Sequence, residues 1–244
     1  MMRGAHANDD SQHVRFTSAQ IAQSLASGGP LRRRRMLNAA EELVHCLQAS
    51  AGAGQVPLAT VINEPAAVHP WKQYQGLGAN SDSDVAGALH YFYHAHSMPG
   101  LPREEHGHFH LFVRLGINPA GMFDHTHLVA IGVDARGLPL RMFTLNRWVT
   151  DETWTPSHRL IAMAEQIATQ SNPQDTYVER WLRAQIGMFA PQIAGLLLHR
   201  DRRICARQQH GQRRRLLEDR RINILSQCKV SIERQLTALT RQAH

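Results

Sequence analysis

Residues 88–115 read ALHYFYHAHSMPGLPREEHGHFHLFVRL, two alternating segments joined by a stretch with two prolines and a glycine. Successive side chains of a β-strand point to opposite faces, so this period of two predicts strands over 88–96 and 105–115. Proline and glycine mark turns, and two alternating segments around a turn are typical of an antiparallel hairpin. We therefore expect these two strands to pair with each other.

Two more strands are expected after this hairpin. Residues 127–134, HLVAIGVD, and residues 138–146, LPLRMFTLN, are apolar segments on either side of a turn. Outside this region the apolar residues take helical spacing. The sequence thus predicts an α+β fold, in which a central antiparallel β-sheet of about four strands, a meander over 88–146, is flanked by N- and C-terminal helices. Helices are expected at 16–28, 31–50, 157–168 and 176–203, the last of them broken at Pro191.

Composition divides the chain into three parts. Residues 1–15 are polar and are expected to be disordered, and residues 16–205 are expected to form a single α+β domain that carries the histidine-rich sheet. Residues 206–244 alternate arginines with apolar positions, which predicts an Arg-rich amphipathic helical tail. Residues 56–87 contain three prolines and are expected to form a long irregular loop.

The composition also excludes several classes of protein. Hydrophobic residues make up 43% of the 244 residues, which is enough for a buried core. The three cysteines lie far apart and form no C-x-x-C pair, which argues against a disulfide framework or a cysteine-rich zinc module. The N-terminal residues lack a signal-peptide core, and no apolar run has the roughly 20 residues needed to cross a membrane. We therefore expect a soluble, cytoplasmic protein that does not associate with membranes.

Histidine is concentrated in the predicted sheet, where eight of the sixteen histidines lie within residues 90–127. They recur with a period of two, so those of one strand share a face, and a hairpin brings the faces of two strands together. Imidazole is the commonest metal-binding side chain, and three or four imidazoles can hold one zinc ion. The sequence therefore predicts a site for a divalent transition metal, with zinc or iron as leading candidates. The predicted ligands are His94, His96, His108 and His110, with His106 and His127 in reserve.

The leading functional hypothesis is a metal-dependent enzyme with hydrolytic or non-haem oxygen chemistry. Glu105 is the candidate general base, because it opens the second histidine-rich strand. Arg147, in TLNRWVTDETW (residues 144–154), is the candidate anchor for a small anionic substrate. Two other interpretations of the histidines stay open, a metal-free acid–base site and a structural or surface role. The chain contains no G-x-S-x-G, G-x-x-x-x-G-K-[ST] or G-x-G-x-x-G motif, which argues against a serine nucleophile and against nucleotide chemistry.

Two non-enzymatic functions compete with this hypothesis. The histidines also suit a non-catalytic metal carrier or sensor, or a haem-binding protein with histidine axial ligands. The Arg-rich tail is compatible with nucleic-acid binding, because 27 Lys+Arg against 20 Asp+Glu give a net charge of +7. Asp201, Glu218 and Asp219 interrupt the arginines, however, and apolar helical spacing runs through the same segment. A solvated helix face is therefore favoured over a nucleic-acid interface.

Several motifs of the chain are long enough to be specific: HYFYHAH (90–96), EHGHFHLFVR (105–114), HLVAIGVDARGLPLRMFTLNRWVTDETW (127–154) and, more weakly, MFAPQIAGLLLHRD (188–201). On these motifs the chain resembles a family of bacterial proteins of unknown function. The resemblance covers about residues 30–205, implies one domain of common fold, and brings no activity with it. Residues 68–84 are poorer in aromatic, proline and aspartate residues than the corresponding stretch of the family, and the tail beyond about residue 205 falls outside the resemblance.

Overall fold

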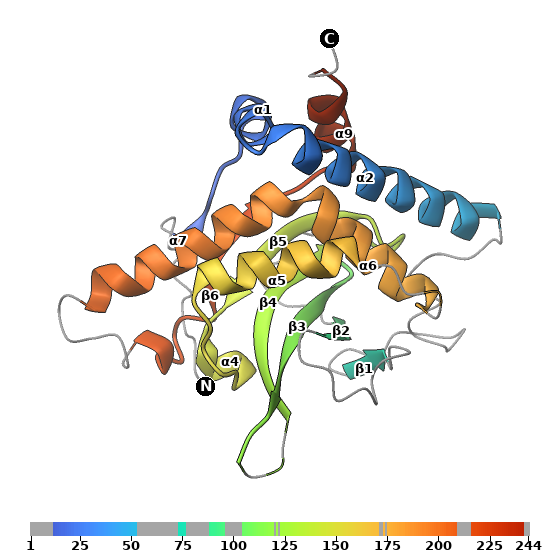
Figure 1. Ribbon diagram of the computed structural model, residues 1–244. Coiled ribbons are helices and arrows are strands. Elements are labelled where there is room, and N and C mark those ends of the chain that lie inside the picture. The colour runs from blue at the N-terminus through green and yellow to red at the C-terminus, as the bar shows by residue number, and fades with distance from the viewer. Residues whose placement is uncertain are drawn as a thin grey trace.

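The protein has an α+β fold in which helices pack on one face of an open antiparallel sheet (Figure 1). This agrees with the fold class predicted from the sequence. None of the helices in the described part of the chain combines the length and the hydropathy that crossing a membrane requires. The computed structural model describes residues 12–52, 73–76, 88–95, 104–119, 121, 123–170, 173, 175–208 and 216–241, with residues 73–76 described by their backbone alone.

Among the described residues, six strands form the sheet in the order in which they occur in the sequence, and each pairs antiparallel with the next. The predicted four-stranded meander corresponds to β2–β5 and is confirmed, and β1 and β6 extend the sheet at its two edges. The strands are β1 (Gln73–Gly76), β2 (Leu89–Ala95), β3 (Gly107–Ile117), β4 (Phe123–Val133), β5 (Pro139–Leu145) and β6 (Ile224–Lys229).

The predicted helices are present, and local sequence explains where they begin. Thr176 and Glu179 form a capping box at the start of α6, in which the Thr176 N–H donates to Glu179 Oε2 at 2.7 Å. Phe189 separates α6 from α7, and Pro191 lies in the first turn of α7, where no N–H of the residue is needed. The predicted break is therefore confirmed. The helices are α1 (Ser18–Ser27), α2 (Gly29–Gly52), α4 (Arg147–Thr150), α5 (Ser157–Thr169), α6 (Tyr177–Met188), α7 (Ala190–Gln208) and α9 (Ile232–Arg241).

The helices form two layers over the same face of the sheet. Helices α5, α6 and α7 lie next to the sheet, and α1, α2 and α9 lie beyond them, with α2 packed against α6 and α1 against α9 (Figure 1). The main core fills the space between the sheet and the first helix layer and continues between the two helix layers, where Leu43 of α2 and Leu239 of α9 are buried. It is built around fully buried aromatic side chains, among them Tyr93, Phe109 and Trp181, and the rings of the last two lie 5.2 Å apart.

The C-terminal region differs from the prediction of a helical tail. Residues 224–229 form β6, which pairs with β5, and Ser226 of β6 hydrogen-bonds with Thr144 of β5 through their hydroxyl groups at 2.7 Å. The reason is that β6 satisfies backbone groups along β5 that would otherwise lack partners, and this long-range pairing outweighs local helical spacing. The helical prediction holds for α9.

The expected N-terminal and loop segments are partly described. His13, predicted to be disordered, forms an isolated bridge with Gln227 of β6, and the Val14 N–H donates to the Gln227 carbonyl at 2.8 Å. Residues 1–11 lie outside the described residues. Within the loop expected over 56–87, the described internal stretch is β1, which pairs with β2 instead of being irregular.

Candidate metal centre

The β2–β3 hairpin has two chemically different faces. Alternation along each strand places Tyr93 and Phe109 on the face covered by helices, where they belong to the main core. The same alternation places His94, His108 and His110 on the opposite face. The register of the hairpin pairs His94 with His108, and residues 108 and 110 are two positions apart on one strand. The three imidazoles are therefore neighbours because of the strand pairing predicted from the sequence.

His94, His108 and His110 form a compact cluster in which one ligand nitrogen from each lies within 4.8 Å of the others. The ring centroids of His108 and His110 are 4.6 Å apart, and those of His94 and His108 are 5.7 Å apart. Nitrogens bound tetrahedrally to one zinc ion lie about 3.3 Å apart, given Zn–N bonds of about 2.0–2.1 Å. Small side-chain rotations would therefore bring all three to one ion. His96, the fourth predicted ligand, lies outside the described residues.

A buried ion pair stands behind His108. Oε1 of Glu105 lies 3.5 Å from Nδ1 of His108. The same carboxylate accepts two hydrogen bonds from Arg141 of β5, from Nε at 2.5 Å and from a terminal nitrogen at 2.9 Å. Gly132, which faces His108 across β3 and β4, leaves the space that Glu105 occupies. Because Nδ1 of His108 faces Glu105, Nε2 is left to meet an ion, and carboxylate partners of this kind orient metal-binding imidazoles.

The protonation states of Glu105 and His108 suit a metal centre. Burial opposes the ionisation of Glu105, but the hydrogen bonds from His108 and Arg141 and the charge of Arg141 outweigh it, so the pKa of Glu105 is lowered. Burial also lowers the pKa of His108, against the opposing effect of Glu105. Glu105 is therefore ionised and His108 neutral at neutral pH, which are the states in which a carboxylate supports a metal-binding imidazole.

His127 of β4 lies beside the cluster. Its ring centroid is 5.8 Å from that of His110 and 5.1 Å from that of Phe112, and the side chain is only 1% exposed. Its backbone N–H is held by Glu152 Oε2 at 2.6 Å. Nε2 of His127 is buried and has no hydrogen-bond partner among the described residues. Burial lowers the pKa of His127 to about 3, so the ring is neutral at neutral pH.

Phenylalanine rings surround the imidazoles on the same face. Phe92 stacks on His110 with ring centroids 4.6 Å apart and planes 25° apart, and Phe112 lies 5.7 Å from Phe92 in a similar orientation. Phe143 of β5 meets the edge of His108 at 5.3 Å. Phe92 is half-buried, whereas the other two rings are buried. This apolar surrounding lowers the local dielectric constant and so strengthens electrostatic interactions at the cluster.

Two predicted site residues lie apart from the cluster. His106 precedes β3, and its Nδ1 lies 2.7 Å from the hydroxyl of Tyr93, a residue of the helix-covered face. Arg147 begins α4, after the end of β5, and its side chain forms ion pairs with Glu218 and, at 3.9 Å, with Asp151. The contacts that the structure gives Arg147 are thus with two carboxylates and not with the histidines.

Arg141 and Gly132 support the cluster, but neither was predicted from the sequence as a site residue. Arg141 is a charged residue inside the apolar strand PLRMFTL, which is a signal of a buried ion pair. Gly132 interrupts an apolar strand, and a glycine inside a strand often marks the close approach of another group. Both signals were visible, but neither identifies its partner without the register of the sheet.

Comparison with known proteins places the chain in a family. A family model described as a domain of unknown function (DUF6969) matches residues 37–230. The match includes β2–β6 and every residue of the cluster, and it extends beyond residue 205, where the resemblance based on sequence motifs ends. No curated protein and no solved structure matches the chain. The chain belongs to the DUF6969 family, whose function is unknown.

Proposed function

We propose that this protein binds a divalent transition metal ion, zinc or iron, through His94, His108 and His110, and that it is a metal-dependent enzyme. The observation that carries the proposal is the cluster of three imidazoles with the buried pair of Glu105 and Arg141 behind His108. Metal-binding histidines almost always donate their second ring nitrogen to such a partner. A histidine with a packing role needs no buried carboxylate held in place by an arginine.

The number of ligands favours an enzyme over a purely structural site. The three ligands found among the described residues leave one position of a tetrahedral ion open, as in catalytic zinc sites. A metal ion in such a site lowers the pKa of water or polarises an oxygen of the substrate. Glu105 would keep His108 in the tautomer with its proton on Nδ1, and Arg141 would keep Glu105 in position. Because both oxygens of Glu105 already accept hydrogen bonds from Arg141, we assign Glu105 to positioning of His108 in place of the general-base role expected from the sequence.

A small anionic substrate, as expected from the sequence, would bind to the metal ion and not to Arg147. Arg147 is engaged by Glu218 and Asp151, so its charge is already balanced by carboxylates. Arg141, which lies closer to the cluster, is balanced by Glu105. With the charges of these two arginines balanced, the ion itself is the positive charge that we assign to an anionic substrate.

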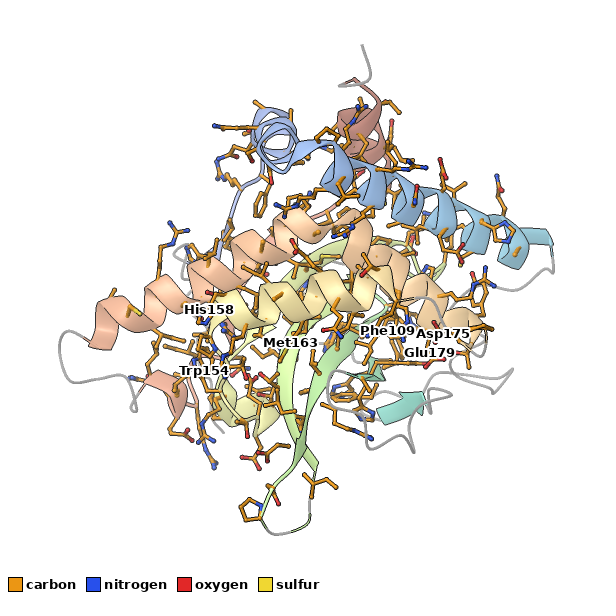
Figure 2. All side chains as sticks on the ribbon, viewed as in Figure 1. Phe109, Trp154, His158, Met163, Asp175 and Glu179 are labelled. Carbon is orange, nitrogen blue, oxygen red and sulfur yellow. The ribbon has the colours of Figure 1, made fainter. Side chains whose placement is uncertain are left out.

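Metal content tests the proposal. Elemental analysis would compare the untagged protein with a His108→Ala/His110→Ala variant and with His158→Ala, which removes an exposed histidine from α5 in the helix layer (Figure 2). We expect about one equivalent of zinc or iron in the wild type and in the control, and none in the double variant. Circular dichroism would establish that all three are folded. A wild type without stoichiometric metal, also after reconstitution with zinc, iron and copper, would contradict the proposal.

The coordination shell distinguishes an enzyme from a metal carrier or sensor at the same site. X-ray absorption spectroscopy of the loaded protein counts imidazole and oxygen ligands around the ion. Three imidazoles and an exchangeable oxygen ligand would support the enzyme. Four imidazoles, with His96 or His127 as the fourth, would saturate the ion and support a carrier.

A further inference from the structure

The cluster offers a metal ion no negatively charged ligand from the described residues. Its three members are histidines, which are neutral when they bind a metal. The nearby carboxylate of Glu105 is balanced by Arg141, and these two side chains are only 0% and 8% exposed. A divalent ion in this site would keep its full charge in an apolar surrounding, where an uncompensated charge is costly. The open position of the ion therefore favours an anionic ligand over a neutral one.

A second polar group, the imidazole of His127, lies next to the cluster. Nε2 of His127 is buried without a hydrogen-bond partner among the described residues, although the ring lies 5.8 Å from His110 between centroids. A buried polar atom left without a partner costs about 1–3 kcal/mol, so its persistence suggests a partner that arrives with the ligand. An imidazole with its proton on Nε2 donates one hydrogen bond. Because the His127 ring is a neighbour of His110, this donor is the candidate partner for a ligand bound to the ion.

The aromatic rings indicate the shape of the rest of the ligand. Phe92 is half-buried and stacks on His110, and the ring of Phe112 is nearly parallel to that of Phe92, at 21° between planes. Because Phe92 is partly exposed, its ring can contact a ligand beside the cluster, and contact between aromatic rings favours a flat apolar body in the ligand. The polar groups and the rings together describe a ligand with one charged end and a flat apolar end.

We propose that the ligand of this site is a small aromatic carboxylate, and that His127 is a specificity-determining residue that donates a hydrogen bond to it. One carboxylate oxygen would take the open position of the ion, and the other would accept the hydrogen bond from His127 Nε2. The ring of the ligand would lie against Phe92. This inference rests on the proposed function, because it needs an ion held by His94, His108 and His110.

The experiment uses cobalt(II) in the full-length protein, because the visible absorption of cobalt reports changes in its ligands. The loaded protein is titrated with benzoate, acetate and benzyl alcohol. We expect both carboxylates to change the spectrum, with benzoate binding about tenfold more tightly than acetate because of its stacked ring, which corresponds to about 1.4 kcal/mol. Benzyl alcohol, which is neutral and carries the same ring, should leave the spectrum unchanged at matched concentrations.

Variants assign the effect to individual residues. His127→Phe keeps a buried ring without a donor and should weaken both carboxylates about tenfold, whereas His127→Gln keeps a donor and should retain most of the affinity. Phe92→Leu should reduce the preference for benzoate and leave acetate binding unchanged. Phe16→Leu is the matched control, because Phe16 is also half-buried but packs against Gly195 of α7. It should behave as the wild type.

The outcomes separate this inference from the proposed function. A protein that binds no cobalt overturns the proposed function and this inference with it. Cobalt binding without any response to benzoate or acetate overturns the inference and leaves the metal site in place. If His127→Phe and His127→Gln bind both carboxylates as the wild type does, His127 does not determine specificity. If His127→Phe loses cobalt, His127 is a ligand of the ion, which also overturns its assignment as a donor to the carboxylate.

Discussion

Gly132 lies directly beneath the carboxylate of Glu105, so that a Cβ atom added to Gly132 would come within 2.8 Å of Glu105 Cδ. The missing side chain at this position of β4 is what allows Glu105 to reach both His108 and Arg141. Glycine weakens a strand, because it contributes no side chain to packing and loses more conformational freedom on folding. The space given to Glu105 accounts for a glycine in the middle of an otherwise apolar strand.

Replacement of this glycine should weaken metal binding through Glu105. In Gly132→Ala the new methyl group displaces the carboxylate and leaves His108 without its partner, so zinc affinity should fall about 10–100-fold. Competition with a chromophoric chelator measures the affinity. Glu105→Gln should cause a similar loss, and the Gly132→Ala/Glu105→Gln double variant should be no weaker than Glu105→Gln alone. Losses that add in the double variant would show that Gly132 acts independently of Glu105.

The ion pair of Glu105 and Arg141 should be sensitive to the loss of one partner. Glu105→Gln leaves the charge of Arg141 buried, so the free energy of unfolding of the metal-free protein should fall by about 3–5 kcal/mol, measured by urea denaturation. Glu105→Gln/Arg141→Met removes both charges and should recover much of this loss. The control is the single variant Arg141→Met. If the double variant loses as much free energy of unfolding as Glu105→Gln and Arg141→Met lose together, the two side chains are not coupled as the geometry indicates.

Asn146 should contribute to stability through its buried side chain. Its amide group donates to the carbonyls of Leu216 at 2.7 Å and Ile222 at 3.0 Å, and its Oδ1 accepts from the backbone N–H of Arg147 at 3.0 Å. Asn146→Ala should therefore lower the free energy of unfolding by about 3 kcal/mol. Urea denaturation would show this. Asn38→Ala, at an exposed position of α2, is the matched control and should change stability by less than about 0.5 kcal/mol.

The three cysteines should differ in reactivity. Burial raises the pKa of Cys46 to about 11 and that of Cys228 to about 12, with Glu42 adding to the effect at Cys46, whereas Cys205 is exposed. A thiol with a pKa of 11 is only about 0.1% thiolate at pH 8, and the thiolate is the reactive form. An aromatic disulfide reagent should thus label one thiol of the native protein at pH 8, and three after denaturation.

A serine variant is the control for this labelling experiment, and the rate of labelling should depend on pH. Cys205→Ser should remove the native reaction. Raising the pH toward 11 should speed the reaction of Cys46 in the folded protein, because its thiolate fraction increases about tenfold for each pH unit below the pKa. Rapid labelling of two or three thiols at pH 8 in the folded state would contradict the burial of Cys46 and Cys228.

The meander and the histidine cluster were predictable because both follow from local alternation. A period of two identifies β2 and β3, and a hairpin brings the histidines of one face together without further information. The partnership of Glu105 with Arg141 was not predictable in this way, because the two lie on segments whose alignment depends on the register of β3, β4 and β5. That register contains irregularities, among them one between Leu111 and Phe112, which alternation alone does not reveal.

The prediction of a helical tail was wrong at β6 for a similar reason. ILSQCK is short, and its buried residues do not alternate cleanly: Leu225, Ser226 and Cys228 are all buried. The apolar residues around it fit helical spacing, so the local pattern favours a helix. What makes the segment a strand is the pairing with β5, which is distant in the sequence, and local patterns carry no information about distant partners.

Because β6 comes late in the sequence, the edge of β5 stays unpaired while the rest of the chain is being synthesised. Strands β2–β5 precede the helices α5–α7 in the sequence, whereas the strand that covers the edge of β5 follows all three. Until residues 224–229 leave the ribosome, the unpaired backbone of β5, an apolar strand, is a template for pairing with another chain. At about 5–20 residues per second the roughly 80 residues after β5 take about 4–16 seconds to emerge. Aggregation on the ribosome is therefore the hazard that this topology creates, and a chaperone bound to the nascent chain would protect β5 during that interval.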